Sequence, residues 1–339
     1  MSNFQNLSGD EQITHLHEMA CIALRQWDGE FHDIALIKYR ENAVFSAYRH
    51  DGQRIALRVH RHNYHCEAAL RSELQWMEAL GGEGVEVPSI IRARDDQHLV
   101  SVYTDAVGET RHVDMLVWLS GSTLGTSESG VSTSTEIAPL FFNAGAVAAS
   151  IHNHSETWQQ PDEFIRHAWD EEGLIGSQPF WGRFWDLQAL TGEQRELLLL
   201  ARRAARNDLR RYGRNQANYG MIHADFVPEN LLVEGAKLRL IDFDDAGFGW
   251  HMFELATALY FSLEDPRYNE MEDALFAGYA SVRPLSNADR ALLPLFLTLR
   301  GMTYLGWVHT RAGSATALEL TDFLIERTCM LARTYLNCQ

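Results

Sequence analysis

Apolar and polar positions in the first 120 residues predict a small antiparallel sheet with one inserted helix. After an N-terminal stretch with helical spacing, short runs rich in Val, Ile, Tyr and Phe are separated by polar turns, one of which reads HDGQ. The spacing then becomes helical, with Trp76, Met77 and Leu80 on one side and Gly81 and Gly82 as a stop signal. The predicted strands are residues 32–39, 43–50, 54–61, 88–94, 97–104 and 111–121, and the inserted helix is residues 65–82.

The rest of the chain is mainly helical by the same criterion. Residues 121–136 are rich in Ser, Thr and Gly, which predicts a mobile linker or lid. One later helix has Thr191 as its N-cap and Gly213 as its stop. We therefore expect two domains, residues 1–120 and residues 121–339. The predicted helices of the second domain are residues 136–154, 191–213, 251–261 and 287–311.

Composition and charge narrow the class of protein. The 339 residues are 46% apolar and 22% charged, as in ordinary globular proteins, and no apolar run approaches the roughly 18 residues of a membrane span. The formal net charge of −17 disfavours nucleic acid and anionic lipid as partners. The polar N-terminal sequence lacks the features of a secretory signal, and the four cysteines contain no CxxC pair. We therefore expect a cytoplasmic protein without a membrane segment.

One apolar hairpin pattern carries candidate chemistry. The runs NLLV and LRLI flank a turn at Gly235, and such a hairpin brings its two ends together. Asn230 at the entry and Asp242 at the exit would then be neighbours, and their oxygen atoms suit Mg²⁺ that is completed by water and phosphates. Asp225 precedes Asn230 across a turn stiffened by Pro228, so its carboxylate would lie near the metal and accept a proton from a substrate hydroxyl.

These residues resemble a known family. HADFVPEN resembles the HxDxxxxN catalytic loop, and IDFDD the metal-binding segment, of the aminoglycoside phosphotransferase family, whose relatives include choline kinases and type II homoserine kinases. The resemblance implies an α+β, bilobal protein-kinase-like fold, with a small N-terminal lobe of antiparallel sheet and one helix and a larger, mainly helical C-terminal lobe. It makes Asp225 the base, Asn230 and Asp242 the metal ligands, and His223 a prop for the loop. The family usually has Gly at the position of Ala224.

The resemblance extends to the nucleotide site. The loop at Glu41 and Asn42 would cover the nucleotide. Residues 114–120 would form the hinge that binds adenine, with Leu116 and Trp118 in it.

Arg58 falls where a kinase carries its strand-three lysine. The chain has only two lysines, and Lys38 lies one strand too early to take this role. An arginine keeps the charge and can bridge phosphate oxygens, although its planar fork is aimed differently. We therefore expect Arg58, paired with Glu73, to bind the phosphates of ATP.

Acidic and aromatic residues beyond the metal segment are candidates for the acceptor site. Asp244, Asp245 and Glu254 would draw a cationic substrate, or would equally orient the metal site or cap a helix. A helical stripe at residues 300–311 includes Tyr304 and Trp307, and packing also explains such a stripe. Late helices close over the acceptor in the family that the chain resembles, so both side chains are candidates for substrate contact.

The sequence near His60 also suggests a different metal site. His60, His62, His65 and Cys66 lie close together in the chain, but no second ligand cluster with zinc spacing occurs. The end of a strand is the simpler interpretation.

The resulting hypothesis is an ATP-dependent O-phosphotransferase that acts on a hydroxyl of a small, amine-bearing compound: an aminoglycoside, an amino alcohol or a hydroxy amino acid. One alternative is a protein Ser/Thr kinase similar to bacterial stress-response kinases. Another is a nucleotide-binding pseudokinase that regulates a partner, to which only Arg58 points. The sequence contains no P-loop motif GxxxxGK[ST], and it leaves the acceptor and the oligomeric state open.

Overall fold

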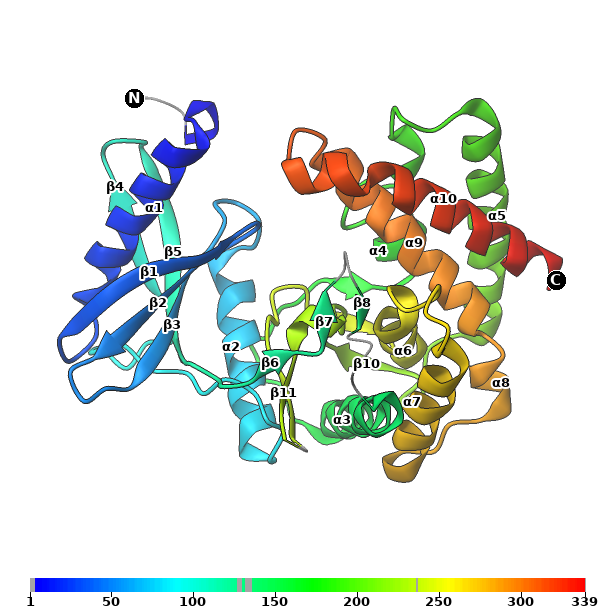
Figure 1. Cartoon of the computed structure of the whole chain (residues 1–339), viewed down its shortest axis with the longest axis horizontal. Helices are drawn as coiled ribbons and strands as arrows, with labels where there is room; N and C mark the ends of the chain where they lie inside the picture. The colour runs from blue at the N-terminus through cyan, green and yellow to red at the C-terminus, as the bar shows by residue number, and fades with distance from the viewer. Residues whose placement is uncertain (1–3, 127–129, 132–135, 236, 339) are drawn as a thin grey trace. The chain divides into compact units, whose positions relative to one another are not determined.

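The computed structural model describes residues 4–126, 130–131, 136–235 and 237–338, and it divides into two compact units (Figure 1). The first unit contains Met1–Gly121 together with two later segments, Gln160–Ile165 and Arg239–Asp244. The second unit contains the remainder of the chain. The sequence did not predict the two segments that return to the first unit.

The first unit is built on a five-stranded antiparallel sheet with the strand order β1-β2-β3-β5-β4. This agrees with the predicted antiparallel lobe that holds one inserted helix, α2. The elements of this unit are a short 3-10 helix at Phe4–Asn6, α1 (Gly9–Leu24), β1 (Phe31–Tyr39), β2 (Ala43–Arg49), β3 (Arg54–Val59), α2 (Glu67–Gly82), β4 (Val100–Thr104) and β5 (Glu109–Val117).

The strand predicted at residues 88–94 does not form. Only an isolated antiparallel bridge joins Ile90 to Leu116, flanked by hydrogen bonds from the Ile91 amide to the Met115 carbonyl and from the Val117 amide to the Ser89 carbonyl, both 2.8 Å. The reason is that β4 already pairs with the first part of the same edge of β5, so this segment finds only the last few positions of that edge.

Alternation along β3 and β5 gives the sheet one apolar face and one face that carries charge. Leu57 and Met115 point into an apolar core that also contains Leu16 and Met19 of α1. Successive side chains of a strand point to opposite faces, so Arg58 points away from that core. The apolar pattern of the strands therefore fixes the direction in which the expected phosphate-binding side chain points.

The second unit is mainly helical, as predicted. Helix α3 packs against α7, and α9 packs against α6 and α10. Sequence patterns did not predict α4, α7, α10 or the short strands β9, β10 and β13, which form a sheet in the order β10-β13-β9. The helices are α3 (Ile137–Thr157), α4 (Glu171–Ile175), α5 (Gly192–Tyr212), α6 (His251–Tyr260), α7 (Tyr268–Val282), α8 (Asn287–Arg290), α9 (Leu293–Thr310) and α10 (Ala315–Asn337), with 3-10 turns at Phe184–Asp186 and Pro228–Asn230. Its strands include β9 (Ala168–Trp169), β10 (Tyr219–Ile222) and β13 (Gly247–Trp250).

The predicted hairpin is present. Strands β11 (Leu231–Glu234) and β12 (Lys237–Leu240) are neighbours in a sheet with β6 (Ser122–Thr123), and Gly235 has a positive φ of 61° at the turn. Left-handed backbone of this kind favours glycine.

The stretch predicted as a mobile linker contains short strands where it is described. These are β6, β7 (Gly125–Thr126) and β8 (Gly130–Val131), of which β7 and β8 pair with each other. Residues 127–129 and 132–135 lie outside the described residues, and so does that part of the linker prediction. Across the parts of the chain that are described, no helix combines the length and the apolar character needed to cross a bilayer.

Candidate functional site

The predicted catalytic loop lies between β10 and β11 in the second unit. Asp225 is partly buried, and Asn230 stands at the end of the 3-10 turn that Pro228 begins. The Asn230 side-chain nitrogen donates to the Asp225 carbonyl at 2.9 Å and to Asp225 Oδ2 at 2.8 Å. These two bonds fix both side chains and turn Oδ1 of Asn230 away from the carboxylate.

A buried arginine holds the other oxygen of Asp225. Arg300 of α9 donates from Nη2 to Asp225 Oδ1 at 2.7 Å and from Nη1 to the Ala224 carbonyl at 2.9 Å. Its guanidinium lies 4.2 Å from the ring centre of Tyr304 and 4.9 Å from that of Trp181. Burial lowers the pKa of Arg300, but Tyr304 and Asp225 outweigh burial and raise it above its ordinary value. The sequence pattern indicates a helical stripe that contains Arg300, but no pattern indicates this ion pair.

Glu254 has a different position from the one expected of a substrate contact. It is fully buried in α6, and its two oxygens accept the backbone N–H groups of His223 at 2.6 Å and of Ala224 at 2.8 Å. Burial raises the pKa of Glu254. The expectation that it draws a cationic substrate is therefore wrong, because a carboxylate sealed beneath the catalytic loop has no access to an acceptor.

The backbone of the same loop is strained at one residue. Ala224 has a positive φ of 62°, a region that costs a non-glycine residue about 1–2 kcal/mol. The two amide bonds to Glu254 on either side of this peptide hold it there, and His223 Nδ1 accepts the Asp225 amide at 3.2 Å. This is the contact expected of a residue that props the loop.

The residues expected to bind metal have suitable donor atoms. Asp242 belongs to the first unit, is exposed and has a positive φ of 67°. Asn230 belongs to the second unit. Its side-chain nitrogen donates to Asp225, so its side-chain oxygen is the atom that would bind a metal ion. A carboxylate and an amide oxygen fit a hard divalent cation that keeps water and phosphate ligands.

The zinc alternative receives no support from the part of the chain that the structure describes. In that part, no group of three or more His, Cys, Asp and Glu side chains is arranged to hold a metal ion.

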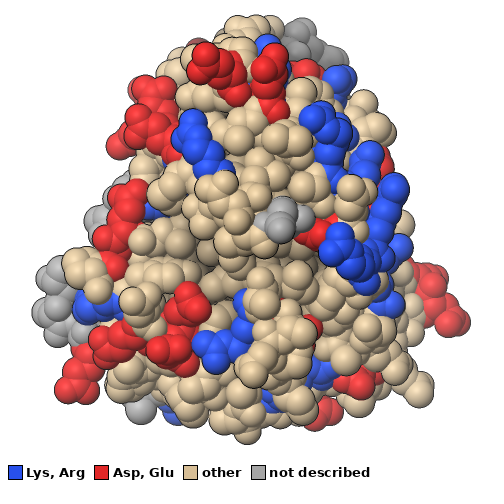
Figure 2. Space-filling view, turned by 90° about the vertical axis from the view of Figure 1, so that its right-hand side faces the viewer, with Lys and Arg blue, Asp and Glu red and all other residues tan. Residues whose placement is uncertain are grey.

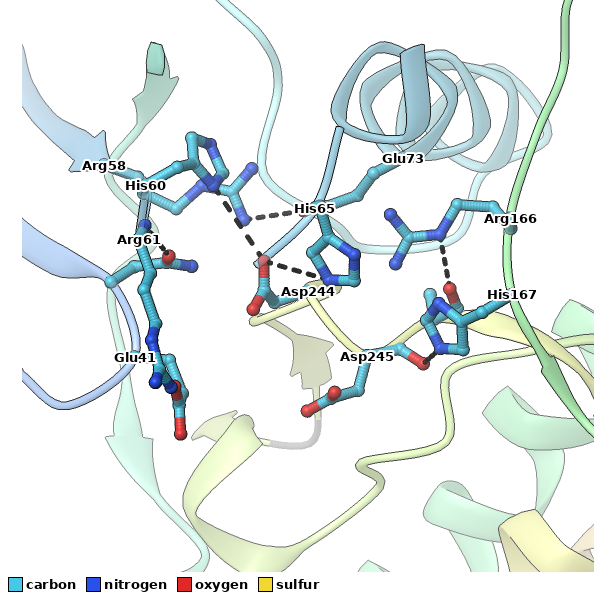
Figure 3. A network of polar contacts seen from close by, with 12 residues as sticks. Glu41, Arg58, His60, Arg61, His65, Glu73, Arg166, His167, Asp244 and Asp245 are labelled. Atoms are coloured by element: carbon cyan, nitrogen blue, oxygen red, sulfur yellow. Dashed lines mark hydrogen bonds and ion pairs between the residues drawn. The ribbon is translucent and has the colours of Figure 1, made fainter. Parts of the chain in front are cut away.

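The charged face of the first sheet carries a buried ion cluster, part of which Figure 3 shows. Arg58 Nη1 donates to Glu73 of α2 at 2.7 Å, as expected. Its Nε and Nη2 donate to Asp114 of β5 at 2.9 and 2.7 Å, and His60 Nε2 lies 2.6 Å from Asp114 Oδ2. Burial alone would raise the pKa of Asp114, but Arg58 and His60 lower it to about 2. The roles of Asp114 and His60 were not predicted.

Asp244 joins the same face and is a second correction. It is 5% exposed and belongs to the first unit, where His60 Nδ1 and His65 Nε2 face its Oδ1 at 3.9 and 3.8 Å (Figure 3). A buried carboxylate between two imidazole rings does not line a solvent-accessible acceptor site, so the predicted substrate contact is wrong.

The expected nucleotide-loop and hinge residues already take part in contacts within the first unit. Asn42 Oδ1 accepts the Arg61 amide at 3.0 Å, which ties the β1–β2 turn to the end of β3. Leu116 lies buried within β5. The Trp118 amide donates to the Arg54 carbonyl at 3.2 Å, and the Arg54 guanidinium lies 3.7 Å from the Trp118 ring centre. Adenine contacts by these residues stay a prediction.

Asp245, the third carboxylate expected at the acceptor site, belongs to the second unit together with Asp225. Trp181 Nε1 donates to Asp245 Oδ1 at 3.2 Å, and the Asp245 carbonyl accepts Trp169 Nε1 at 2.8 Å. Trp181 contacts Tyr304, which in turn accepts a hydrogen bond from Arg300 at 2.7 Å. Asp245 therefore connects through aromatic side chains to the residues that hold Asp225.

The remaining acceptor candidate, Trp307, is only partly buried and lies one helical turn beyond Tyr304. Its ring centre lies 5.2 Å from the Arg311 guanidinium carbon. Contact of Tyr304 and Trp307 with a substrate stays a prediction.

Known proteins with similar sequences include kinases. Amicoumacin kinase of Bacillus subtilis (strain 168) is 24% identical over 321 residues, which cover 88% of this chain and 86% of that protein. A homoserine kinase of Gluconobacter oxydans (strain 621H) is 28% identical over 261 residues, which cover 71% and 73% of the two chains.

Solved structures agree with this result. The structure of a microcompartment-associated aminopropanol kinase has a TM-score of 0.83 and 33% identity, and the match covers 95% of this chain and 98% of that one. An amicoumacin kinase in complex with AMP-PNP and Ca²⁺ has a TM-score of 0.76 and covers 94% of this chain and 95% of the other, but at 18% identity it supports the fold alone. The predicted α+β, kinase-like fold is confirmed.

The profile of the phosphotransferase enzyme family matches residues 38–285, from the first strand of the sheet to the end of α7. That range includes the catalytic loop, the ion cluster of Arg58 and the segment that carries Asp242. The chain therefore belongs to the phosphotransferase enzyme family, and it is a kinase whose acceptor group is an alcohol.

Proposed function

We propose that this kinase transfers the γ-phosphate of ATP, bound with Mg²⁺, to the hydroxyl group of a small amino alcohol. The observation that carries the proposal is the arrangement around Asp225, which Arg300 and Asn230 hold by one oxygen each while Asp245 lies in the same network of contacts. The aminopropanol kinase that is 33% identical to this chain supports a short acceptor with both an amine and a hydroxyl.

In this mechanism Asp225 receives the acceptor hydroxyl. Each carboxylate oxygen has two lone pairs, and the Asp225 side chain is 22% exposed, so an acceptor O–H can approach it from the exposed side. The Arg300 cation stabilises the ionised carboxylate and fixes its plane. Asp225 then orients the hydroxyl oxygen toward the phosphorus atom and accepts its proton as the new bond forms.

The other roles follow from the donor atoms. Asn230 and Asp242 would hold Mg²⁺, which neutralises charge on the phosphates when bound. Arg58, with Glu73, would contact the phosphates from the first unit. Asp245 would pair with the ammonium group of the acceptor, and Trp307 would contact its carbon chain. Most of the rate enhancement would come from positioning and charge.

The test is a turnover assay with ATP and Mg²⁺ against matched acceptors. Each amine is compared with the alcohol that lacks it: 1-amino-2-propanol with 2-propanol, and ethanolamine with ethanol. Homoserine, an aminoglycoside and a generic protein acceptor complete the set. We expect turnover with a short amino alcohol and little with its amine-free partner. Equal turnover of the two partners, or preference for the protein acceptor, would contradict the proposal.

A variant separates chemistry from binding. Asp225→Asn keeps the shape, removes the charge and leaves one oxygen to accept either Asn230 or Arg300, so turnover should fall by about 10³-fold or more while AMP-PNP binding stays near the wild-type value. Nucleotide binding is measured by calorimetry. Near-normal turnover of this variant would refute the role of Asp225.

A further inference from the structure

Arg58, the residue expected to bind the phosphates, is held by the carboxylates of Glu73 and Asp114. The generic kinase arrangement has a single carboxylate, from the helix, as the partner of its strand-three cation. Arg58 and Asp114 stand directly opposite each other in the antiparallel pair of β3 and β5, so their side chains share one face of the sheet. Glu73 approaches from α2. All three side chains are 5% exposed or less, which makes the cluster a fixed part of the first unit.

The geometry of these bonds restricts what Arg58 can do. Hydrogen bonds to described residues use three of its five N–H groups, on Nε, Nη1 and Nη2. One N–H group remains on each terminal nitrogen. Because Asp114 accepts two roughly parallel bonds, the guanidinium can neither slide nor rotate in its plane. A lysine at this position would have a single nitrogen for both carboxylates.

His60 holds Asp114 from the other side. Its Nε2 lies 2.6 Å from the Asp114 oxygen that also accepts Arg58 Nη2, and the His60 backbone amide donates to the His112 carbonyl at 2.9 Å. The ring is 3% exposed. The buried Asp114 carboxylate is held from two directions and therefore keeps one orientation. This in turn fixes the orientation of the Arg58 guanidinium group.

We propose that Asp114 is a positioning residue for nucleotide binding, which aims the two remaining N–H groups of Arg58 at the phosphates, with His60 holding Asp114 in place. The inference rests on the proposed function, in which Arg58 meets the phosphates. It also explains why the chain carries arginine where a kinase carries lysine. The Asp114 carboxylate on β5 accepts two hydrogen bonds from one guanidinium group, and a lysine ammonium cannot form this pair while it also bonds to Glu73.

The experiment is a double-mutant cycle on the full chain. Wild type, Asp114→Asn, Arg58→Lys and the double variant are compared by the dissociation constant of AMP-PNP with Mg²⁺ and by separate KM values for ATP and acceptor. Each single variant should weaken AMP-PNP binding about tenfold or more and leave the acceptor KM unchanged. The double variant should bind AMP-PNP more tightly than Arg58→Lys alone, because the new lysine then has Glu73 as its only acidic partner.

A matched control uses another ion pair of the same strand. Glu109→Gln breaks the contact between Glu109 and the buried Arg111, which lie 2.7 Å apart, and should lower the melting temperature without changing AMP-PNP binding. His60→Gln supplies a second route to the same result if Asp114→Asn does not fold, with a smaller loss of AMP-PNP affinity expected.

Two results would overturn the inference: Asp114→Asn and His60→Gln changing only the melting temperature, or losses in the double variant that equal the sum of the single losses. Calorimetry with AMP-PNP needs no acceptor. If no acceptor is phosphorylated, the proposed function fails, and the binding series still decides the role of Asp114.

Discussion

Asp245 differs from its two acidic neighbours in the metal segment because aromatic N–H groups surround it. Trp181 donates to its carboxylate, and Trp169 and His167 face its carbonyl at 2.8 and 3.0 Å. Asp244 is buried against histidines and Asp242 is exposed. Three acids within four positions therefore have three different surroundings, and Asp245 is tied through Trp181 to the residues around Asp225.

This difference leads to a prediction for Asp245→Asn. Asparagine can still accept the Trp181 bond but has no charge for an ammonium group, and a charge-assisted hydrogen bond contributes about 1.5–3 kcal/mol. The KM for an amino alcohol should therefore rise about tenfold or more, while the KM for ATP stays unchanged. Steady-state kinetics measures both. Asp322→Asn, which removes the same charge from an exposed position of α10, should change neither. A rise in the KM for ATP alone would contradict the assignment.

Sequence patterns could predict some of these residues and not others. Asp225, Asn230 and Asp242 follow from a local motif, and the Arg58–Glu73 pair follows from resemblance. The bonds from Arg58 to Asp114 and from Arg300 to Asp225 join residues 56 and 75 positions apart, and a single sequence has no periodic signal for such pairs. One indirect signal was present: Asp114 interrupts the apolar run VDMLVW, and a buried acid needs a partner.

Among the elements, α3 and α7 approach each other closely through glycine. A Cβ atom on Gly278 would meet the Phe142 carbonyl oxygen at 1.8 Å, and one on Gly145 would meet the Leu275 carbonyl oxygen at 2.0 Å. Helix α3 also bonds to the strand before the catalytic loop, since Ser155 Oγ donates to the Met221 carbonyl at 2.7 Å. The contact between the two helices thus supports the strand from which the loop begins.

Gly278→Ala should force these two backbones apart. We expect the free energy of unfolding to fall by about 3 kcal/mol, the upper range for overpacking a close contact. Urea unfolding followed by tryptophan fluorescence measures the change. Gly192→Ala is the control, because Gly192 lies in the first turn of α5 with no neighbouring atom within 4 Å, and it should be neutral or slightly stabilising. Equal stability of the two variants would mean that the helices separate without cost.

Element boundaries were harder to predict than elements. The helix predicted over residues 287–311 is divided into α8 and α9, and Pro294 stands in the first turn of α9, where a missing N–H costs nothing. Helix α7 was missed although its buried side chains include Met271, Leu275 and Tyr279 at helical spacing. Its glycine contacts depend on a partner helix far away in sequence, which no local pattern reveals.

On the scale of the whole molecule, the chain is acidic, with a formal net charge of −17. On the face that Figure 2 shows, most basic side chains lie toward the right and most acidic side chains toward the top and left. Within the second unit, arginines of α5 meet carboxylates of α4 and its N-cap: Arg206 and Arg210 lie 3.0 and 2.8 Å from Glu171, and Arg214, just beyond α5, lies 2.9 Å from Asp170. Exposed pairs of this kind contribute little to stability. They do neutralise the basic helix, and the absence of a nucleic-acid partner stays a prediction.

Global stability should depend on pH through a buried pair of histidines. His152 of α3 and His251 of α6 stack with ring centres 4.1 Å apart. Burial lowers the pKa of both rings well below the ordinary value, and Arg283 adds to this effect. The unfolded chain therefore binds protons that the folded protein does not. Above the unfolded-state pKa of about 6.5, the two neutral histidines do not lower the free energy of unfolding. As the pH falls below this value, protonation of the unfolded chain lowers the free energy of unfolding, by about 2–3 kcal/mol in total at about pH 5.5.

Thermal unfolding at pH values on both sides of about 6.5 tests this prediction. His251→Gln removes one of the two groups and should halve the pH dependence. The raised pKa of Glu254 acts in the opposite direction, since stability then falls as pH rises above its unfolded value, but this residue is present in both proteins and cancels in the comparison. An unchanged pH dependence in the variant would contradict the assignment.

The first unit is made from three separate stretches of chain, and this sets the order of events during synthesis. Its sheet, α1 and α2 have left the ribosome once Gly121 emerges. The stretch that contains Asp242 and Asp244 is translated only after two of the three stretches of the second unit, and these include the catalytic loop. At ~5–20 residues per second, the nascent sheet waits roughly 6–25 seconds before Asp244 can reach His60 and His65. Until then the nitrogen atoms of His60 and His65 that face Asp244 in the folded protein lack this carboxylate.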